Sequence, residues 1–285
     1  MVQRIIFGAI YAILAICLFL FASPIVTGIV MCFVSVMAVT EFLKAIQLLD
    51  TKTKLPLVIV SYLFCIILSL ATIYSGIIFR NNGVSAPFND YSNLLICIVL
   101  YIISAFVIMV LNHDNISFSD ISSTITGNIY ITVSLMHIYL IRSLPDGEFY
   151  IWIPFLIAWL TDTFAYFTGF FIGKHKLIPK VSPKKTIEGS IGGIVGAIII
   201  VVLYQYICSK ILIIEPNYIK GAIIAVVCSI ASQFGDLAAS CIKREHDVKD
   251  FGNIMPGHGG VLDRFDSVIY ISPIVFLILN YIKIF

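Results

Sequence analysis

The sequence predicts an all-α protein that crosses a lipid bilayer about nine times, and three observations support this. The 285 residues are 60% apolar and only 12% charged, with a mean hydropathy of +1.03, whereas soluble domains are about half apolar and about a quarter charged. The apolar residues gather in runs of about 20, the length at which a helix spans the hydrocarbon core. Turn-forming residues separate these runs. This composition excludes a soluble globule or a disordered chain, and we expect no nucleic-acid partner.

Each apolar run is expected to form one membrane-spanning helix, with bounds uncertain by a few residues. The runs are 4–22, 25–48, 55–79, 93–112, 122–141, 149–172, 189–208, 218–242 and 265–283. We expect a single multi-pass membrane domain over 1–285. Within it, 1–145 carries few buried polar groups, and 149–283 carries the motifs that suggest chemistry.

The basic residues predict the orientation of the helices. If the nine runs alternate in direction, 13 of the 18 lysines and arginines fall on one side of the membrane. Basic residues gather on the cytoplasmic side of membrane proteins. The N-terminus should therefore be cytoplasmic, in a protein of the cell (inner) membrane.

The two halves of the sequence differ in their ionisable residues. Near the end of the second run, Glu41 and Lys44 are three residues apart, a spacing at which we expect a local ion pair. From Trp159 onward, ionisable residues occur inside or beside the apolar runs. Placing one such charged side chain in the membrane costs roughly 2.5–3.5 kcal/mol on insertion scales, so these residues are candidates for function.

The sixth run carries an acid, a phenol and a glycine on one helical face, because Asp162, Tyr166 and Gly169 follow a spacing of four and three residues. Asp162 is either a structural acid capped by neighbouring threonines or an acid that faces a polar cavity. Gly169 and Gly173 would allow another helix to approach closely.

A basic segment links the sixth and seventh runs. Its lysines from 174 to 180 fit a simple topology signal as well as they fit a functional role. Ser182 and Pro183 predict a capped helix start, at which Lys184 and Lys185 would form a phosphate site. The glycines that follow have the spacing of close helix packing, and we assign them to packing instead of phosphate binding. They are Gly189, Gly192, Gly193 and Gly196.

The eighth run places Asp236, Ser240 and Lys243 on one face, with the acid and the cation too far apart for a direct pair. In the loop that follows, glycines surround His258 and leave backbone N–H groups able to approach a phosphate. Asp263 and Asp266 then share a face where the ninth run begins.

These residues together indicate chemistry on phosphates. Carboxylate oxygens from Asp236 and Asp263, among lysines and arginines, suit Mg²⁺ that is bound together with substrate phosphates. No Cys/His cluster accompanies them, so a soft metal fits poorly. The residues therefore predict a Mg²⁺-dependent enzyme that acts on a phosphorylated lipid at the cytoplasmic face.

The last motif-bearing segment also resembles a known family. It reads Ser240-x-Ile-Lys243-Arg244-x4-Lys249-Asp250-x-Gly252-x3-Pro256-Gly257-His258-Gly259-Gly260-x-x-Asp263-Arg264-x-Asp266. This pattern resembles the signature of the phosphatidate cytidylyltransferases (CDP-diacylglycerol synthases). Ser182-Pro-Lys-Lys-Thr-x-Glu-Gly189 and Asp162-x-x-Ala-Tyr166 resemble the same family, in the same order, so the likeness covers roughly 155–272.

The resemblance implies that CTP and phosphatidate react to give CDP-diacylglycerol and diphosphate, with Mg²⁺ and room for a second cation. It also implies an all-helical membrane homodimer with a cavity open to the cytoplasm and to lipid. Asp236 and Asp263 would be the metal ligands, with Lys243 beside them, while Asp162 would be either catalytic or structural. The residues expected to contact substrate are Lys184, Lys185, Ser240, Arg244, His258, Gly259, Arg264 and Asp266.

Other enzymes and a transporter fit parts of this pattern. A CTP-dependent polyprenol or phytol kinase, or a cytidylyltransferase for ether lipids, would share the metal and the lysines. A transporter could also hold buried acids and glycine-interrupted helices. However, inverted repeats are not evident and the ionisable residues lie toward one face, so a transporter fits less well.

Overall fold

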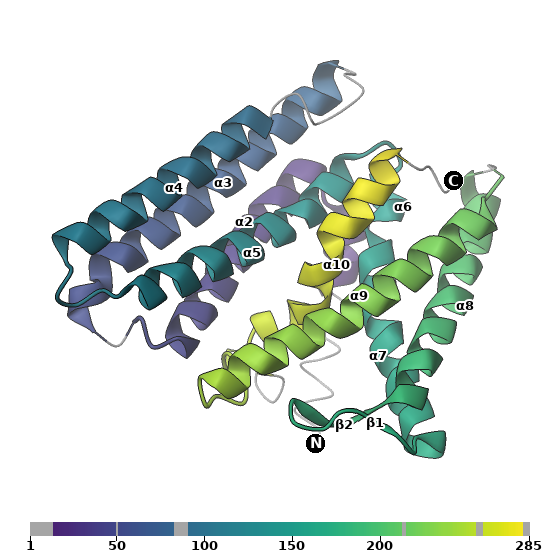
Figure 1. The fold of residues 1–285 in the computed structure, drawn as a ribbon. Coiled ribbons are helices and arrows are strands. Elements are labelled where there is room, and N and C mark those ends of the chain that lie inside the picture. Colours follow the sequence, from purple (N-terminus) through teal and green to yellow (C-terminus); the bar gives the residue numbers. More distant parts are fainter. Residues whose placement is uncertain (1–13, 50, 83–90, 213–214, 255–258, 282–285) are drawn as a thin grey trace. The chain divides into compact units, whose positions relative to one another are not determined.

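The computed structural model describes residues 14–49, 51–82, 91–212, 215–254 and 259–281, and Figure 1 shows it as a ribbon. The chain forms two compact units. The first unit comprises Met1–Pro145 and His246–Arg264, and the second comprises Asp146–Glu245 and Phe265–Phe285.

The described part of the first unit consists of helices. Residues 14–21 are helical, and the elements after them are α2 (Pro24–Ala45), the short 3₁₀ helix η1 (Lys52–Lys54), α3 (Leu55–Asn82), α4 (Tyr91–Leu111) and α5 (Phe118–Ser143). The second unit contains α6 (Gly147–Tyr150), α7 (Trp152–Ile172), the strands β1 (Lys176–Ile178) and β2 (Ser182–Thr186), α8 (Ile187–Leu212) and α9 (Tyr218–Glu245). The last helix is α10 (Leu262–Tyr281), whose first three residues belong to the first unit.

The described residues confirm the all-α membrane fold. A helix occupies each of the nine predicted runs, although residues 4–13 of the first run lie outside the described residues. Seven helices of the described chain are long and apolar enough to cross a membrane, namely α2, α3, α4, α5, α7, α8 and α9. The protein is therefore a multi-pass membrane protein, while its orientation stays a prediction.

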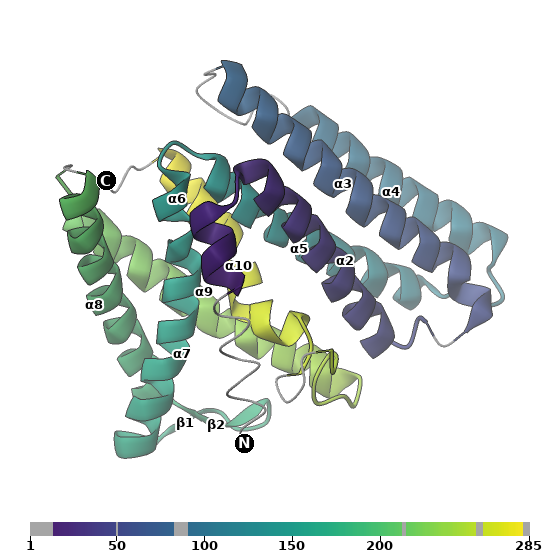
Figure 2. The ribbon, with the colours of Figure 1, turned by 180° about the vertical axis from the view of Figure 1, so that it is seen from behind.

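Polar contacts join the helices of the first unit. Figures 1 and 2 show from opposite sides that α3 lies beside α4 and that α2 lies beside α5. Asn128 of α5 donates its side-chain N–H to the carbonyl of Ser61 (2.9 Å) and to the hydroxyl of Tyr101 (3.2 Å). Because lipid tails give helices no hydrophobic reason to associate, such bonds help to select their partners.

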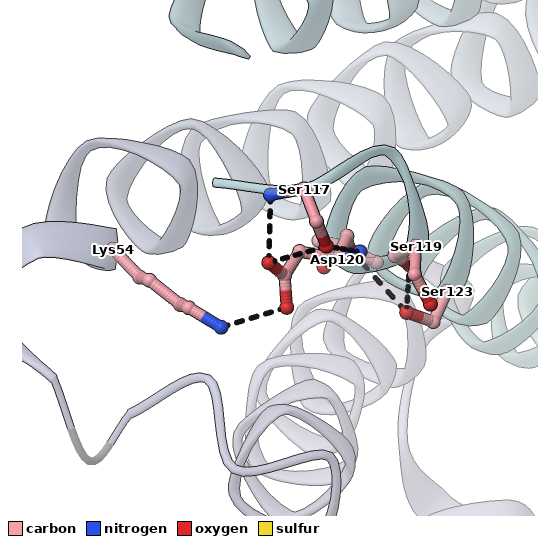
Figure 3. Close-up of polar contacts among 6 residues, drawn as sticks. Lys54, Ser117, Ser119, Asp120 and Ser123 are labelled. Carbon is pink, nitrogen blue, oxygen red and sulfur yellow. Dashed lines mark hydrogen bonds and ion pairs between the residues drawn. The ribbon is translucent and has the colours of Figure 1, made fainter. Parts of the chain in front are cut away.

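A second polar group fixes the start of α5, as Figure 3 shows. Ser117 and Asp120 form a capping box, in which each side chain accepts the backbone N–H of the other residue. Lys54 donates to the second carboxylate oxygen of Asp120 at 2.7 Å. The carboxylate therefore caps one helix and ties it to η1, directly before α3.

In the second unit, α8 packs against α7 through its glycines, which confirms the packing role expected for them. A Cβ on Gly193 would lie 2.9 Å from the carbonyl oxygen of Thr161, and one on Gly189 would lie 2.7 Å from that of Ala165. Side chains at these positions would force the two helices apart. Thr161 also donates its hydroxyl to Ser229 of α9 (2.9 Å), so α7 contacts both neighbouring helices.

The segment before α8 corrects one prediction, because Ser182–Thr186 forms a strand instead of the first turn of a helix. It pairs in antiparallel fashion with β1, with Lys176 opposite Thr186. The helix begins at Ile187, and the hydroxyl of Thr186 accepts the N–H of Gly189 at 3.1 Å. Pro183 fits an edge strand as well as a helix start, and Thr186, not Ser182, provides the cap. Lys184 and Lys185 are therefore carried by a hairpin.

Candidate active site

A cavity of about 670 Å³ lies within the second unit, between α7, the hairpin, α8 and α9. Two carboxylates line it, from Asp162 of α7 and Asp236 of α9, and lysines of the hairpin line it as well. Tyr166 and Gly169 also line it, which confirms that the predicted face of the sixth run is directed at one place. Asp162 faces a polar cavity, as the second of the two interpretations required.

The central contact of the cavity joins two segments distant in sequence. The ammonium group of Lys185 on β2 forms an ion pair with the carboxylate of Asp236, and both side chains keep about a quarter of their surface exposed. Each charge thus has its counter-ion, and the ammonium nitrogen of Lys185 is itself buried although part of its side chain is exposed. A phosphate that enters here meets a cation already held in place by an acid.

Further charged groups surround this pair. Asp162 lies within electrostatic range of both Asp236 and Lys185. Asp266, near the start of α10, lies within range of Asp236, Asp162 and Lys243. The second unit therefore gathers three acids and two cations, and all five were predicted to take part in catalysis or substrate binding.

The lysines of the basic segment separate into two groups. Lys184 and Lys185 of β2 line the cavity, as predicted for a phosphate site, and so does Lys176 of β1. Lys174 and Lys180 are exposed but do not belong to the lining. Part of this basic segment therefore provides cations to the cavity.

Glu188 holds the hairpin against the first turn of α8. Its carboxylate accepts the backbone N–H of Lys174 (3.1 Å) and of His175 (3.2 Å), and it lies 2.6 Å from Nδ1 of the His175 ring. The sequence analysis included Glu188 in a motif but assigned it no role. The available signal was an acid in the first turn of a helix, where backbone N–H groups lack helical partners.

One edge of the cavity is aromatic. Tyr166 and Phe170 stack with ring centroids 6.3 Å apart, and each exposes about two thirds or more of its surface. Both residues line the cavity. Exposed aromatic rings next to fixed charges suit a molecule that is apolar at one end and anionic at the other.

The other predicted residues of α9 do not line the cavity. Ser240 and Lys243 are half-buried, and Arg244 is exposed in the last turn. Gln233 was not predicted, yet it lines the cavity and donates to the carbonyl of Ser190 at 3.4 Å.

The signature residues from Lys249 to Arg264 belong to the first unit. One carboxylate oxygen of Asp263 accepts the N–H of Phe251 (2.8 Å) and of Gly260 (3.0 Å). Gly259 has a φ of +82°, a conformation that favours glycine. Arg264 is exposed. His258 lies outside the described residues, and its role stays a prediction.

Glu41 has a different partner from the one predicted. Its carboxylate accepts the N–H of Val261 (2.9 Å) and of Leu262 (2.8 Å), at the start of α10. Lys44 is exposed and forms no ion pair with it, so the predicted local pair is wrong. The reason is that Glu41 is 3% exposed and meets buried helix-end N–H groups, which are favourable partners for a carboxylate.

The cavity offers oxygen donors for a metal. Within the described residues, no three His, Cys, Asp or Glu side chains come close enough to hold a metal ion by themselves. Carboxylates within range of one another, with lysines beside them, nevertheless fit Mg²⁺, which normally takes its remaining ligands from water and substrate phosphates. The residues present therefore fit a metal shared with a phosphorylated substrate.

Comparison with known proteins identifies the family. The sequence model of the Cytidylyltransferase family matches residues 2–282. The chain belongs to this family. Among curated members, it is 40% identical over 170 residues to the phosphatidate cytidylyltransferase of Staphylococcus haemolyticus, and 36% identical over 171 residues to that of Bacillus subtilis. These alignments cover 60% of this chain and 63% and 62% of the two relatives, so the chain spans just under two thirds of their length.

Proposed function

We propose that the protein is a phosphatidate cytidylyltransferase, which converts CTP and phosphatidate into CDP-diacylglycerol and diphosphate. The observation that carries the proposal is the cavity of the second unit, where Lys185 is paired with Asp236 beside exposed aromatic rings. The curated relatives carry this activity in their names, and the membrane fold suits a lipid substrate.

The reaction needs little covalent help from the protein. A phosphate oxygen of the lipid attacks the α-phosphorus of CTP, a new P–O–P bond forms, and the bond to the β-phosphate breaks to release diphosphate. Because the nucleophile is already anionic, no strong base is required. The barrier comes mainly from repulsion between two anions and from charge that develops on the leaving group, so fixed cations should provide most of the catalysis.

The residues of the cavity can supply these cations. We assign Lys184 and Lys185 to phosphate groups, since both line the cavity. Asp236 keeps the ammonium of Lys185 oriented. Tyr166 and Phe170 provide an apolar edge for the lipid.

We propose Mg²⁺ as the cofactor, with Asp236 and Asp263 as its protein ligands and a second cation possible. When bound, the metal would neutralise phosphate charge and polarise the attacked phosphorus. Lys243 would lie beside it, and Asp162 would contribute negative charge. We retain the remaining predicted substrate contacts, which are Ser240, Arg244, His258, Gly259, Arg264 and Asp266.

The position of the enzyme in the cell is also part of the proposal. The distribution of lysines and arginines supports an inner-membrane protein whose active site faces the cytoplasm, where CTP is available. The family resemblance supports a homodimer.

The position of a radioactive phosphate tests the reaction. Purified protein in phosphatidate-containing liposomes would receive CTP labelled at the α- or the γ-phosphate. Cytidylyl transfer puts the α-label into lipid and the γ-label into diphosphate. A γ-label in lipid would indicate a kinase and would overturn the proposal, whereas an ether-linked acceptor used in preference to phosphatidate would indicate an ether-lipid enzyme.

A further inference from the structure

We propose that Glu41 is a positioning residue of the reaction, although it lies in the second predicted run, far in sequence from every motif. Its carboxylate fixes the segment that carries Asp263 and thereby sets the direction of that acid. The inference rests on the proposed function for its kinetic consequences, while the contact itself is a property of the first unit alone.

The contact is bidentate and buried. The two carboxylate oxygens of Glu41 accept different N–H groups, from Val261 at 2.9 Å and from Leu262 at 2.8 Å. These groups lie where α10 begins and have no helical acceptor of their own. Since the side chain is only 3% exposed, water cannot take its place without a rearrangement.

Two glycines leave room for this carboxylate. A Cβ on Gly252 or on Gly260 would collide with Glu41, and in both cases the three nearest atoms belong to the Glu41 side chain. Sequence reasoning placed Gly260 among the glycines that leave N–H groups for a phosphate. The structure instead shows that it forms part of the wall around a buried glutamate.

The same segment is held from its other side by Asp263. One oxygen of this side chain accepts the N–H of Phe251 and the N–H of Gly260, the residue directly before Val261. Glu41 and Asp263 thus bind consecutive backbone groups of one short segment. If Glu41 releases Val261 and Leu262, the first turn of α10 loses its anchor and the Asp263 carboxylate changes direction.

The conservative variant Glu41→Gln removes the negative charge of the side chain and keeps its shape. A glutamine side chain has one acceptor and one donor group, so one of the two backbone N–H groups would face another donor. The matched control is Lys44→Gln, which removes the neighbouring charge from the exposed side of the same helix.

Hydrogen–deuterium exchange measures the contact without any substrate. In Glu41→Gln, amides of 259–264 should exchange at least about tenfold faster than in the wild type, because a buried hydrogen bond to a charged group is lost. Amides of α8 and α9 should be unaffected. In Lys44→Gln, all of these rates should remain those of the wild type.

Kinetics measures the consequence for the reaction. Support for a metal ligand typically accounts for about 10- to 100-fold in metal affinity or activity, so Glu41→Gln should raise the Mg²⁺ concentration for half-maximal activity and lower kcat by about tenfold or more. KM for CTP should change less than about threefold, because Lys184 and Lys185 do not depend on Glu41. A purely structural role would lower the amount of active protein without moving the Mg²⁺ dependence.

A double-mutant cycle distinguishes loss of the Glu41 contact from general misfolding. Gly252→Ala should accelerate exchange of 259–264 on its own, because its Cβ meets Glu41, but it should add little in a Glu41→Ala background, where that space is empty. Additive effects of the two changes would contradict the contact.

The outcomes separate the two proposals. Wild-type exchange and Mg²⁺ dependence in Glu41→Gln, or equal changes in Lys44→Gln, would overturn the role of Glu41. If the wild type forms no CDP-lipid, the proposed function fails, and the exchange data alone then decide whether Glu41 holds the segment.

Discussion

Each unit contains a carboxylate on a helix that accepts two backbone N–H groups, but the two carboxylates differ in how far they are exposed. In the first unit, Glu41 accepts two backbone N–H groups at the start of α10 and is almost completely buried. In the second unit, Glu188 accepts two backbone N–H groups directly before the hairpin strand β1, and 23% of its side chain is exposed. In both, a carboxylate on a helix accepts backbone N–H groups close in sequence to predicted site residues.

The polar groups of the two units therefore differ in role. Several polar groups of the first unit bind one another or the backbone, as in the contact between Asn128 and Ser61. The second unit keeps Lys185 and Asp236 partly exposed around a cavity. We therefore expect substitutions at the cavity to affect catalysis most, and substitutions at the supporting contacts to have smaller effects that depend on burial.

The largest effect is expected for the proposed metal ligands. Asp236→Asn and Asp263→Asn should each lower CDP-lipid formation by at least about 100-fold, because both remove charge that the reaction requires. The measurement is Mg²⁺-dependent turnover of protein that elutes as folded in detergent. Glu245→Gln, at the exposed end of α9, is the control and should retain activity. Near-normal turnover in either aspartate variant would defeat the metal assignment.

The hairpin lysines come next. Lys184→Ala combined with Lys185→Ala should reduce kcat/KM for CTP or phosphatidate by about 10- to 100-fold per lysine, the value of a hydrogen bond to a charged group. Lys174→Ala combined with Lys180→Ala removes the same charge from the same segment but outside the cavity lining. Equal losses in the two double variants would mean that the segment acts only through its net charge.

Helix packing in the second unit should affect stability before catalysis. Gly193→Ala places a Cβ 2.9 Å from the carbonyl oxygen of Thr161, and overpacking of this kind costs about 1–3 kcal/mol. Thermal unfolding in detergent should show a lower midpoint. Ile191→Ala, at an exposed position of the same helix, should leave the midpoint nearly unchanged. A midpoint equal to that of the wild type in Gly193→Ala would show that α7 and α8 do not pack as described.

The smallest effect is expected at Glu188, and its size can be compared directly with the effect at Glu41. Because water can replace an exposed partner, Glu188→Gln should lower kcat/KM by less than about fivefold, with faster amide exchange confined to 174–178. His175→Phe, which removes only the exposed ring contact, should do less. A loss as large as that of Glu41→Gln would show that burial does not set the importance of these contacts.

Local patterns in the sequence predicted the helices well. Runs of about 20 apolar residues located the long helices of the described chain, because the bilayer requires length and apolar character and little else. The face of Asp162, Tyr166 and Gly169 was also predictable, since helical spacing determines which side chains share a side.

Contacts between distant segments were not predictable in this way. Glu41 and Val261 are 220 residues apart, so the nearby Lys44 was the only visible partner. Ser182 and Pro183 match a helix start by local rules, yet pairing with Lys176–Ile178 makes them a strand. The ion pair of Lys185 with Asp236 likewise depends on how the hairpin lies against α9.

The most direct test of the account is the stoichiometry of the reaction in liposomes. Purified protein would receive labelled CTP and Mg²⁺ with and without phosphatidate, and both diphosphate and lipid-bound cytidine would be counted. The account predicts one diphosphate for each CDP-diacylglycerol and no CTP turnover without the lipid. Diphosphate or free nucleotide released without phosphatidate, with no label in lipid, would contradict it.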